Sequence, residues 1–145
     1  IRTPDGELLG EHAGLMFHTI GQRHGLGIGG RRDGDGAPWY VASKEPENNT
    51  LIVVQGHDHP ALFHRRLRAS QLHWIAGQAP TIPLHCQAKI RYRQHDQACV
   101  LDALDPRGAT VRFLEPQRAI TPGQSIVFYL ADNCLGGGTI DAAWD

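Results

Sequence analysis

Several features that help to classify a protein are scarce in these 145 residues. The three cysteines form no C-x-x-C pair, which argues against a disulfide framework and favours a reducing compartment such as the cytoplasm. No apolar run reaches the roughly 18 residues of a membrane span, so we expect no membrane partner. The first residues, IRTPDGELLG, are neither a secretory signal nor a basic transit peptide, and they lack an initiator methionine. We therefore expect the sequence to be a piece of a longer chain.

A large excess of charge is absent too, since the formal net charge is −1 at pH 7. That value by itself disfavours a nucleic-acid binder. The distribution along the chain is nevertheless uneven, because residues 65–118 carry nine of the 14 Lys and Arg residues but four of the 15 Asp and Glu residues. A basic segment between acidic flanks can form a surface for polyanions. A solvated face of mixed charge is the alternative, and composition does not separate the two.

Long helical periodicity is also missing, and short apolar runs separated by Gly, Pro, Asn and Asp favour an all-β protein. The runs WYVAS and TLIVVQG flank the turn-rich KEPENN, so Trp39–Gly56 is predicted to form a β-hairpin. GHDHP then interrupts the pattern, and we place a domain boundary near residues 57–65. Residues 1–62 are too few to bury a generous core alone. We expect them to form a small domain with a β-hairpin and little helix.

Strand-like runs recur at regular spacing in residues 63–145. They are joined by short turn-like segments and read LRASQLHWI, LHCQAKIRYR, ACVLDAL, ATVRFL, SIVFYLA and GGTIDAA. One connection, DPRG, has the Asp-Pro start and late Gly of a type I hairpin turn. Closing such a sheet would remove its exposed edges. The predicted fold class is therefore mainly β: the small hairpin domain is followed by a roughly six-stranded antiparallel β-barrel.

The stretch HTIGQRHGLGIGG holds Gly25, Gly27 and Gly30 at the G-x-G-x-x-G spacing of dinucleotide-binding loops. Such a loop needs a following helix, whose N-terminus holds the pyrophosphate. The continuation RRDGDGAPWY contains more Gly and Pro, which prevents a helix there. We therefore predict a loop whose glycines permit positive φ angles or close approach to another surface. Gln22, Arg23 and His24 are the residues that it would present.

Histidines and cysteines form no recognisable catalytic or metal site. His57 and His59 have an H-x-H spacing, but no second pair has the spacing that zinc sites use. Cys99 lies close to His95, yet it opens an apolar strand and is expected to pack as a small hydrophobic residue. Cys134, in NCLGGG, is expected on an exposed turn. We predict no metal site and no catalytic residue in this sequence.

The most informative local pattern is AKIRYRQ. In an extended strand the side chains alternate between faces, so Lys89, Arg91 and Arg93 would share one face and Tyr92 the other. Three neighbouring cations repel one another unless an anion lies between them, and phosphates are suitable because Arg binds them bidentately. Tyr92 could stack on a base. The alternative is a solvated face of the barrel.

A second segment, ITPGQS, reads as a turn that places Gln124 at the start of a strand. Glutamine can hydrogen-bond a base edge or a phosphate. The segment alone marks Gln124 as nothing more than a turn residue.

Taken together, these segments resemble the tRNA-specific 2-thiouridylases, which thiolate the wobble uridine of certain tRNAs. The matching stretches follow the family's order through nearly the whole chain: GEHAGLMFHTIGQRHGLGIGG, PWYVASKEPENNTLIVVQGHDHP, SQLHW, AKIRYRQ, ITPGQSIVFY and CLGGGTI. His24 and Phe17 depart from the family, where Lys and Tyr are common.

The resemblance implies an enzyme with an N-terminal ATP-pyrophosphatase domain, a small central domain and a C-terminal β-barrel. The N-terminal part carries an S-G-G-x-D-S loop and both reactive cysteines. No SGG motif occurs here, and no cysteine of this sequence matches a catalytic position. The resemblance thus implies that residues 1–62 are the central domain and residues 63–145 the tRNA-binding barrel. By this resemblance the piece binds no cofactor and is inactive alone, while ATP with Mg²⁺ serves the full-length enzyme.

In the implied reaction, ATP adenylates the C2 oxygen of uridine, and sulfur from a cysteine persulfide then replaces it. The family's tRNA contacts in the barrel fall on the Arg-Tyr of RYRQ and the Gln of TPGQ. Here these residues are Arg91, Tyr92 and Gln124. Strict alternation puts Arg91 and Tyr92 on opposite faces, so a bulge, a strand end or an edge position is required. Weaker candidates for contacting tRNA or facing the active site are Gln22, Arg23, Lys89 and Arg93.

The expected partners are tRNA and, for the full-length enzyme, a cysteine desulfurase or sulfur-relay protein that donates sulfur. A monomer is favoured. One alternative is a β-barrel that docks a sulfur donor or the catalytic domain without binding RNA, which the acidic flanks favour. A second alternative is an independent Cys/His enzyme, which predicts turnover by this chain without ATP.

Overall fold

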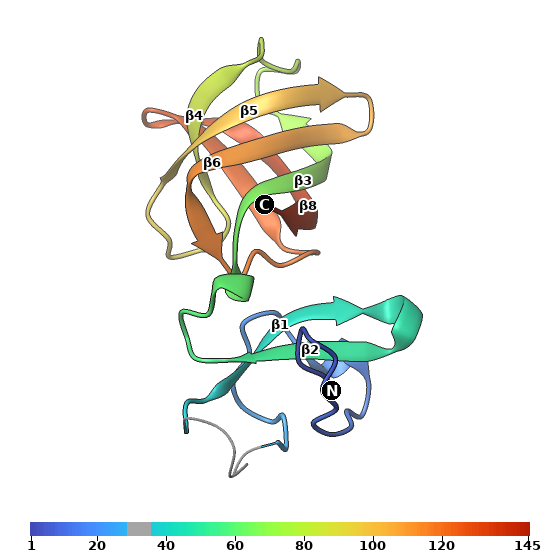
Figure 1. The fold of residues 1–145 in the computed structure, drawn as a ribbon. Coiled ribbons are helices and arrows are strands. Elements are labelled where there is room, and N and C mark those ends of the chain that lie inside the picture. The colour runs from blue at the N-terminus through green and yellow to red at the C-terminus, as the bar shows by residue number, and fades with distance from the viewer. Residues whose placement is uncertain (29–35) are drawn as a thin grey trace. The chain divides into compact units, whose positions relative to one another are not determined.

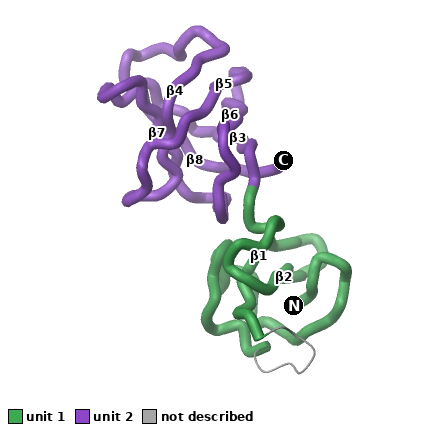
Figure 2. The backbone as a smooth tube through the Cα atoms, turned by 60° about the vertical axis from the view of Figure 1, so that its left-hand side comes forward, with its two compact units in different colours: residues 1–63 green, residues 64–145 purple. Residues whose placement is uncertain are grey.

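In the computed structural model, which describes residues 1–28 and 36–145, the chain divides into two units, residues 1–63 and 64–145 (Figure 2). Strands dominate both units, and the helical segments in the described residues are three-residue 3-10 turns. The predicted mainly β fold class is thereby confirmed. No helix in these parts of the chain is long and apolar enough to cross a membrane. The assignment of residues 1–62 and 63–145 to domains with separate roles stays a prediction.

The first unit is built on a hairpin of two antiparallel strands, β1 (Trp39–Glu45) and β2 (Thr50–Gln55) (Figure 1). Asn49 closes the hairpin loop in the left-handed conformation, with φ of 50°, which Asn tolerates better than most residues. The predicted hairpin is thus confirmed. Three 3-10 turns complete the unit: η1 (Leu15–Phe17), η2 (Pro46–Asn48) and η3 (Pro60–Leu62).

Both faces of this hairpin are buried. Leu51 and Val53 of β2 pack into one apolar cluster with Val41, whereas Val54 packs into a second cluster with Tyr40. Because side chains alternate between the faces of a strand, burial on both sides requires an uninterrupted apolar run. This is why β2 reads TLIVVQ rather than as an apolar–polar alternation.

Both edges of the hairpin are hydrogen-bonded as well. The Arg2 amide donates to the Leu51 carbonyl at 2.9 Å along β2. On the β1 side, the Gly21 amide donates to the Val41 carbonyl at 2.7 Å, and the Val41 amide donates to the Gln22 carbonyl at 2.9 Å. Covered edges offer no template for pairing with another chain. The start of the glycine-rich stretch is therefore held against β1 by two backbone hydrogen bonds.

The second unit is a closed barrel with the strand order β3-β6-β5-β4-β7-β8, and β8 pairs with β3 to close it (Figure 1). The neighbouring strands with described registers are antiparallel. The strands are β3 (Phe63–Trp74), β4 (Leu84–Lys89), β5 (Gln97–Asp105), β6 (Gly108–Arg118), β7 (Ser125–Leu130) and β8 (Asn133–Trp144). This confirms the predicted six-stranded antiparallel barrel.

Side chains from all six strands fill the barrel. Fully buried examples include Leu67, Leu101, Phe113, Phe128 and Ile140. A six-stranded barrel is narrow, so side chains occupy its whole interior and leave no channel for a ligand. Binding must therefore occur on the loops or the outer surface.

The DPRG segment forms the predicted turn between β5 and β6. Asp105 Oδ1 accepts hydrogen bonds from the Arg107 amide at 2.8 Å and the Gly108 amide at 3.1 Å. The same carboxylate binds Arg68 of β3 through two contacts of 2.6 and 2.7 Å. The hydrogen bonds from Arg68, and then from the Arg107 amide, lower the pKa of Asp105.

Glycine at position 136 is required by the close approach of β8 to β3. Gly136 has φ of +142°, and a Cβ atom there would lie 2.0 Å from the His73 carbonyl oxygen. Because that oxygen belongs to a hydrogen-bonded backbone, it cannot move aside cheaply. The GGG of the sequence thus lies where two strands leave no room for a side chain.

We expect Gly136→Ala to lower the free energy of unfolding by about 3 kcal/mol, because the new methyl group overlaps the β3 backbone. Gly77→Ala is the matched control, since Gly77 also has positive φ, +85°, but open space around its Cβ position. The control should cost roughly 1 kcal/mol, from the left-handed conformation alone. Urea denaturation measures both values, and equal losses for the two variants would contradict the steric explanation.

Candidate functional site

The RYRQ segment forms a turn at the end of β4. This strand ends at Lys89, and the Gln94 amide donates to the Arg91 carbonyl at 3.3 Å. The Gln94 side chain accepts a hydrogen bond from the Ile90 amide at 2.9 Å. The first amide after β4 is therefore bonded to a side chain and not to a neighbouring strand. The prediction of a strand through Arg93 with three cations on one face is therefore wrong. A strand end, one of the arrangements that would reconcile Arg91 with Tyr92, is what the structure contains.

Arg91 is anchored to the end of β6. Its Nη2 donates to the Arg118 carbonyl and, at 3.1 Å, to the Ala119 carbonyl. Partial burial, and then the charge of Arg118, lower the pKa of the Arg91 guanidinium. An arginine stays protonated near neutral pH even so. Arg91 therefore carries a positive charge that is held in one place at the turn.

Tyr92 is at the tip of the same turn and, at 95% accessible, is the most exposed of the large hydrophobic residues that the structure describes. A large aromatic side chain that is exposed to water adds nothing to the hydrophobic core. Its exposure is therefore informative about what this part of the surface contacts. An exposed ring on a rigid turn can stack on a flat partner such as a nucleobase.

Gln124 lies on the connection between β6 and β7. Its amide donates to the Thr121 carbonyl at 3.2 Å, and its carbonyl accepts from the Ile140 amide at 2.8 Å. The Thr121 hydroxyl donates to the Ala119 carbonyl at 2.9 Å, the same oxygen that Arg91 contacts. The backbone of Gln124 is thus fixed while its side chain is exposed.

Arg91, Tyr92 and Gln124 line one surface cleft of about 440 Å³. Lys89 lines it too, with its Nζ 3.4 Å from an Asp96 carboxylate oxygen and 5.3 Å from the centre of the Tyr129 ring. The remaining lining residues are Ile90, Ser125, Val127 and Tyr129. Arg93 belongs to the same turn but does not line the cleft. The cleft therefore combines a guanidinium, an ammonium, aromatic rings and an amide, and it contains no acidic lining residue.

Two glutamines that sequence reasoning missed support this cleft. Gln94 Nε2 donates to Gln117 Oε1 at 2.9 Å, and Gln117 is only 5% exposed. RYRQ includes the first of them, but nothing in the sequence connects it with a residue 23 positions away.

Ion pairs neutralise part of the basic segment. Besides Lys89 with Asp96, Arg68 pairs with Asp105, and Arg112 Nε lies 3.2 Å from an Asp102 carboxylate oxygen. Exposed pairs of this kind are weak, but they reduce the net positive field. The charge in the segment is therefore less available to an anion than its composition suggests.

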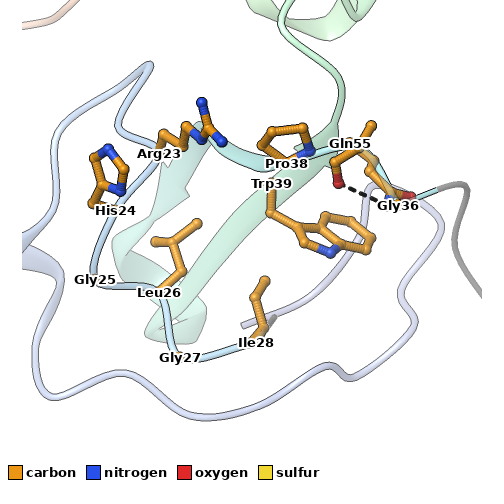
Figure 3. A pocket seen from close by; sticks show the side chains of 11 residues that line it. Arg23, His24, Gly25, Leu26, Gly27, Ile28, Gly36, Pro38, Trp39 and Gln55 are labelled. Carbon is orange, nitrogen blue, oxygen red and sulfur yellow. Dashed lines mark hydrogen bonds between the residues drawn. The ribbon is translucent and has the colours of Figure 1, made fainter. Parts of the chain in front are cut away.

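The glycine-rich stretch borders a second hollow, of about 490 Å³, in the first unit (Figure 3). Arg23, Leu26, Ile28 and Trp39 contribute side chains to its wall (Figure 3). Its other lining residues are His24, Gly25, Gly27, Gly36, Ala37, Pro38 and Gln55. Gly30, part of the G-x-G-x-x-G pattern, lies outside the described residues.

Gln22 holds this stretch together through its side chain. Its Oε1 accepts from the Thr19 amide at 2.9 Å, and its Nε2 donates to the His24 carbonyl at 2.7 Å. Both ends of the amide are thus used within the loop. No described residue of this loop belongs to a helix longer than three residues, the element whose N-terminus holds the phosphates in dinucleotide-binding loops.

Cys86 and Cys99 face each other across β4 and β5, with their sulfurs 3.8 Å apart in the barrel interior. Contact with the Cys86 thiol, and then burial, raise the pKa of Cys99. A nucleophilic cysteine needs a thiolate that substrate can reach, and this pair offers none. Cys134 of β8 is exposed. No group of three or more His, Cys, Asp or Glu residues in the described ranges could hold a metal ion.

Comparison with protein families gives two matches. Residues 1–55 match the model of the "tRNA methyl transferase PRC-barrel domain", and residues 64–140 match that of the "Aminomethyltransferase beta-barrel domain". The second match alone covers more than half of the chain.

Curated relatives share the name tRNA-specific 2-thiouridylase MnmA. The chain is 55% identical to that of Coxiella burnetii (strain CbuK_Q154), over 97% of this chain and 38% of the relative. It is 57% identical to that of Nitrosococcus oceani, over 97% and 38%, and 56% identical to that of Methylococcus capsulatus, over 100% and 40%. The chain therefore spans about two fifths of the length of these relatives.

We expect a thiol reagent such as iodoacetamide to modify Cys134 in the folded protein and to leave Cys86 and Cys99 unmodified, because only Cys134 is exposed. Peptide mass spectrometry identifies the modified sites. Cys134→Ser should then take up no reagent until the protein is unfolded in urea. Rapid modification of Cys86 or Cys99 in the folded Cys134→Ser variant would show that the thiol pair is accessible.

Proposed function

The chain belongs to the tRNA-specific 2-thiouridylase family, and from that premise we propose that it is the tRNA-binding part of an ATP-dependent enzyme that replaces the C2 oxygen of a wobble uridine with sulfur. The catalytic steps, adenylation with ATP and Mg²⁺ and sulfur transfer from a persulfide, are assigned to a part of the longer protein outside this chain. A cysteine desulfurase or sulfur-relay protein would supply the sulfur. The buried thiol pair of Cys86 and Cys99 supports a fragment that is inactive alone.

The observation that carries the proposal is that Arg91, Tyr92 and Gln124 line one cleft. Each offers a different interaction with RNA. A guanidinium binds phosphate oxygens through paired hydrogen bonds, an exposed ring stacks on an unpaired base, and an amide bonds to a base edge or the backbone. The three side chains come together from two loops of the barrel. This arrangement suits recognition of an RNA segment whose bases are unstacked.

The barrel provides the rigid support that such recognition needs. Both loops begin or end within hydrogen-bonded strands, and β7, which follows Gln124, pairs with both β4 and β8. Sites mounted on fixed elements bind with less loss of conformational entropy than sites on free loops.

The competing proposal is a barrel that docks another protein. It is favoured by the ion pairs that neutralise part of the basic segment. The two proposals differ in their response to salt, because phosphate contacts release counterions and protein contacts in a mixed-charge interface do so far less.

We expect Arg91→Ala to weaken binding of unfractionated tRNA and to lower the slope of log affinity against log salt by about one unit, because one phosphate contact is lost. Arg91→Lys keeps the charge and should keep most of the slope. Fluorescence anisotropy with labelled tRNA at several salt concentrations measures both quantities.

Arg107→Ala is the matched control, because it removes an exposed cation from the β5–β6 turn, which does not line the cleft. It should leave the affinity close to that of the wild type. The same loss for Arg107→Ala as for Arg91→Ala would mean that the overall charge, and not the cleft, attracts the RNA.

We expect Tyr92→Ala to reduce tRNA affinity by about 1–3 kcal/mol through loss of base stacking. The melting temperature should not change, since the ring is almost fully exposed. Tyr92→Phe keeps the ring and should bind nearly as well as the wild type. Wild-type affinity in Tyr92→Ala would rule out a stacking role.

A further inference from the structure

A buried side chain at the end of β6 underlies the cleft. Gln117 is 5% exposed, and a buried amide is costly unless its hydrogen bonds are made. Its Nε2 donates to the Glu115 carbonyl at 3.0 Å and to Gln97 Oε1 at 3.2 Å. Its Oε1 accepts from Gln94 Nε2 at 2.9 Å. Gln117 is therefore held in one orientation by three residues on two sides.

Gln94 connects this buried amide to the turn. One end of its side chain contacts Gln117, and the other accepts from the Ile90 amide at 2.9 Å. Removing the Gln94 side chain would deprive both Ile90 and Gln117 of a partner. A polar group that loses its partner away from water costs more than the hydrogen bond itself contributes.

A second connection ties the same turn to β6. Arg91 Nη2 contacts the carbonyls of Arg118 and Ala119, directly after Gln117 in the chain. The turn of residues 90–94 is thus attached to β6 near both of its ends. Tyr92 lies between the two attachments along the chain.

We propose that Gln94 and Gln117 are positioning residues for RNA binding, which hold the Arg91–Tyr92 turn in its binding geometry without touching the RNA themselves. This inference rests on the proposed function and deepens it. Neither glutamine lines the cleft, which separates them from Arg91, Tyr92 and Gln124. Their effect is preorganisation: without them, part of the binding free energy would be spent on ordering the turn.

The inference is tested with unfractionated tRNA and four variants of the full chain. Gln94→Ala should weaken binding about five- to tenfold, the effect of one lost hydrogen bond with an unsatisfied partner. Gln78→Ala, which changes an exposed glutamine of the β3–β4 connection, should bind like the wild type. The other two variants are Arg91→Ala/Tyr92→Ala and the triple variant that adds Gln94→Ala to it.

If Gln94 acts through Arg91 and Tyr92, its replacement has no further effect once both are gone, so the double and triple variants bind equally. A further five- to tenfold loss in the triple variant would overturn the inference, and so would wild-type affinity in Gln94→Ala. Failure of the proposed function looks different, since the Arg91→Ala/Tyr92→Ala variant would then bind tRNA as well as the wild type.

Hydrogen exchange distinguishes a loosened turn from a destabilised barrel. In Gln94→Ala the Ile90 amide should exchange faster by at least about tenfold, because its acceptor is lost. Amides within the barrel strands and away from the turn, such as that of Val111 in β6, should keep their exchange rates. Equal acceleration at Val111 would show a general loss of stability and would overturn the positioning role. Gln117→Leu, which removes the buried amide, should reproduce the faster exchange at Ile90.

Discussion

The carbonyl groups at the end of β6 hold together the two loops on which the candidate RNA interface depends. The Ala119 oxygen accepts from Arg91 of one loop and from the Thr121 hydroxyl of the other. Ala119 itself has φ of 54°, a conformation that costs a non-glycine residue about 1–2 kcal/mol. This local strain turns the chain out of β6 so that one carbonyl serves both loops. The buried contact between Gln94 and Gln117 then fixes the far side of the turn.

The rest of the barrel supports the end of β6, where the two loops are held together. Its interior is filled by side chains, so no ligand enters it, and the candidate RNA-binding side chains lie where strands end. The register of β8 against β3 and β7 places Gly136 where only hydrogen fits, which keeps the strands close. In the first unit, the paired edges and the internal bonds of Gln22 give the glycine-rich stretch a structural role.

The fold followed from the sequence more directly than the site did. Short apolar runs predicted the hairpin and the barrel, and DPRG predicted its turn, because these signals are local. The alternation assigned to AKIRYRQ failed, because the strand is ended by the Gln94 side chain, and the Gln117 that holds this side chain lies 23 residues away. Family resemblance, and not residue pattern, singled out Gln124. The ion pairs that neutralise part of the basic segment could not be predicted from the sequence either, since the Arg68–Asp105 pair joins strands distant in sequence.

In the proposed function, RNA binds where the turns of residues 90–94 and 121–124 meet. The most direct test is to titrate the ¹⁵N-labelled chain with unfractionated tRNA and follow each backbone amide by NMR. If RNA binds at these turns, the largest changes fall on residues 90–94 and 121–125, with small changes in residues 1–63. Largest changes within residues 1–63, with both turns unaffected, would contradict it.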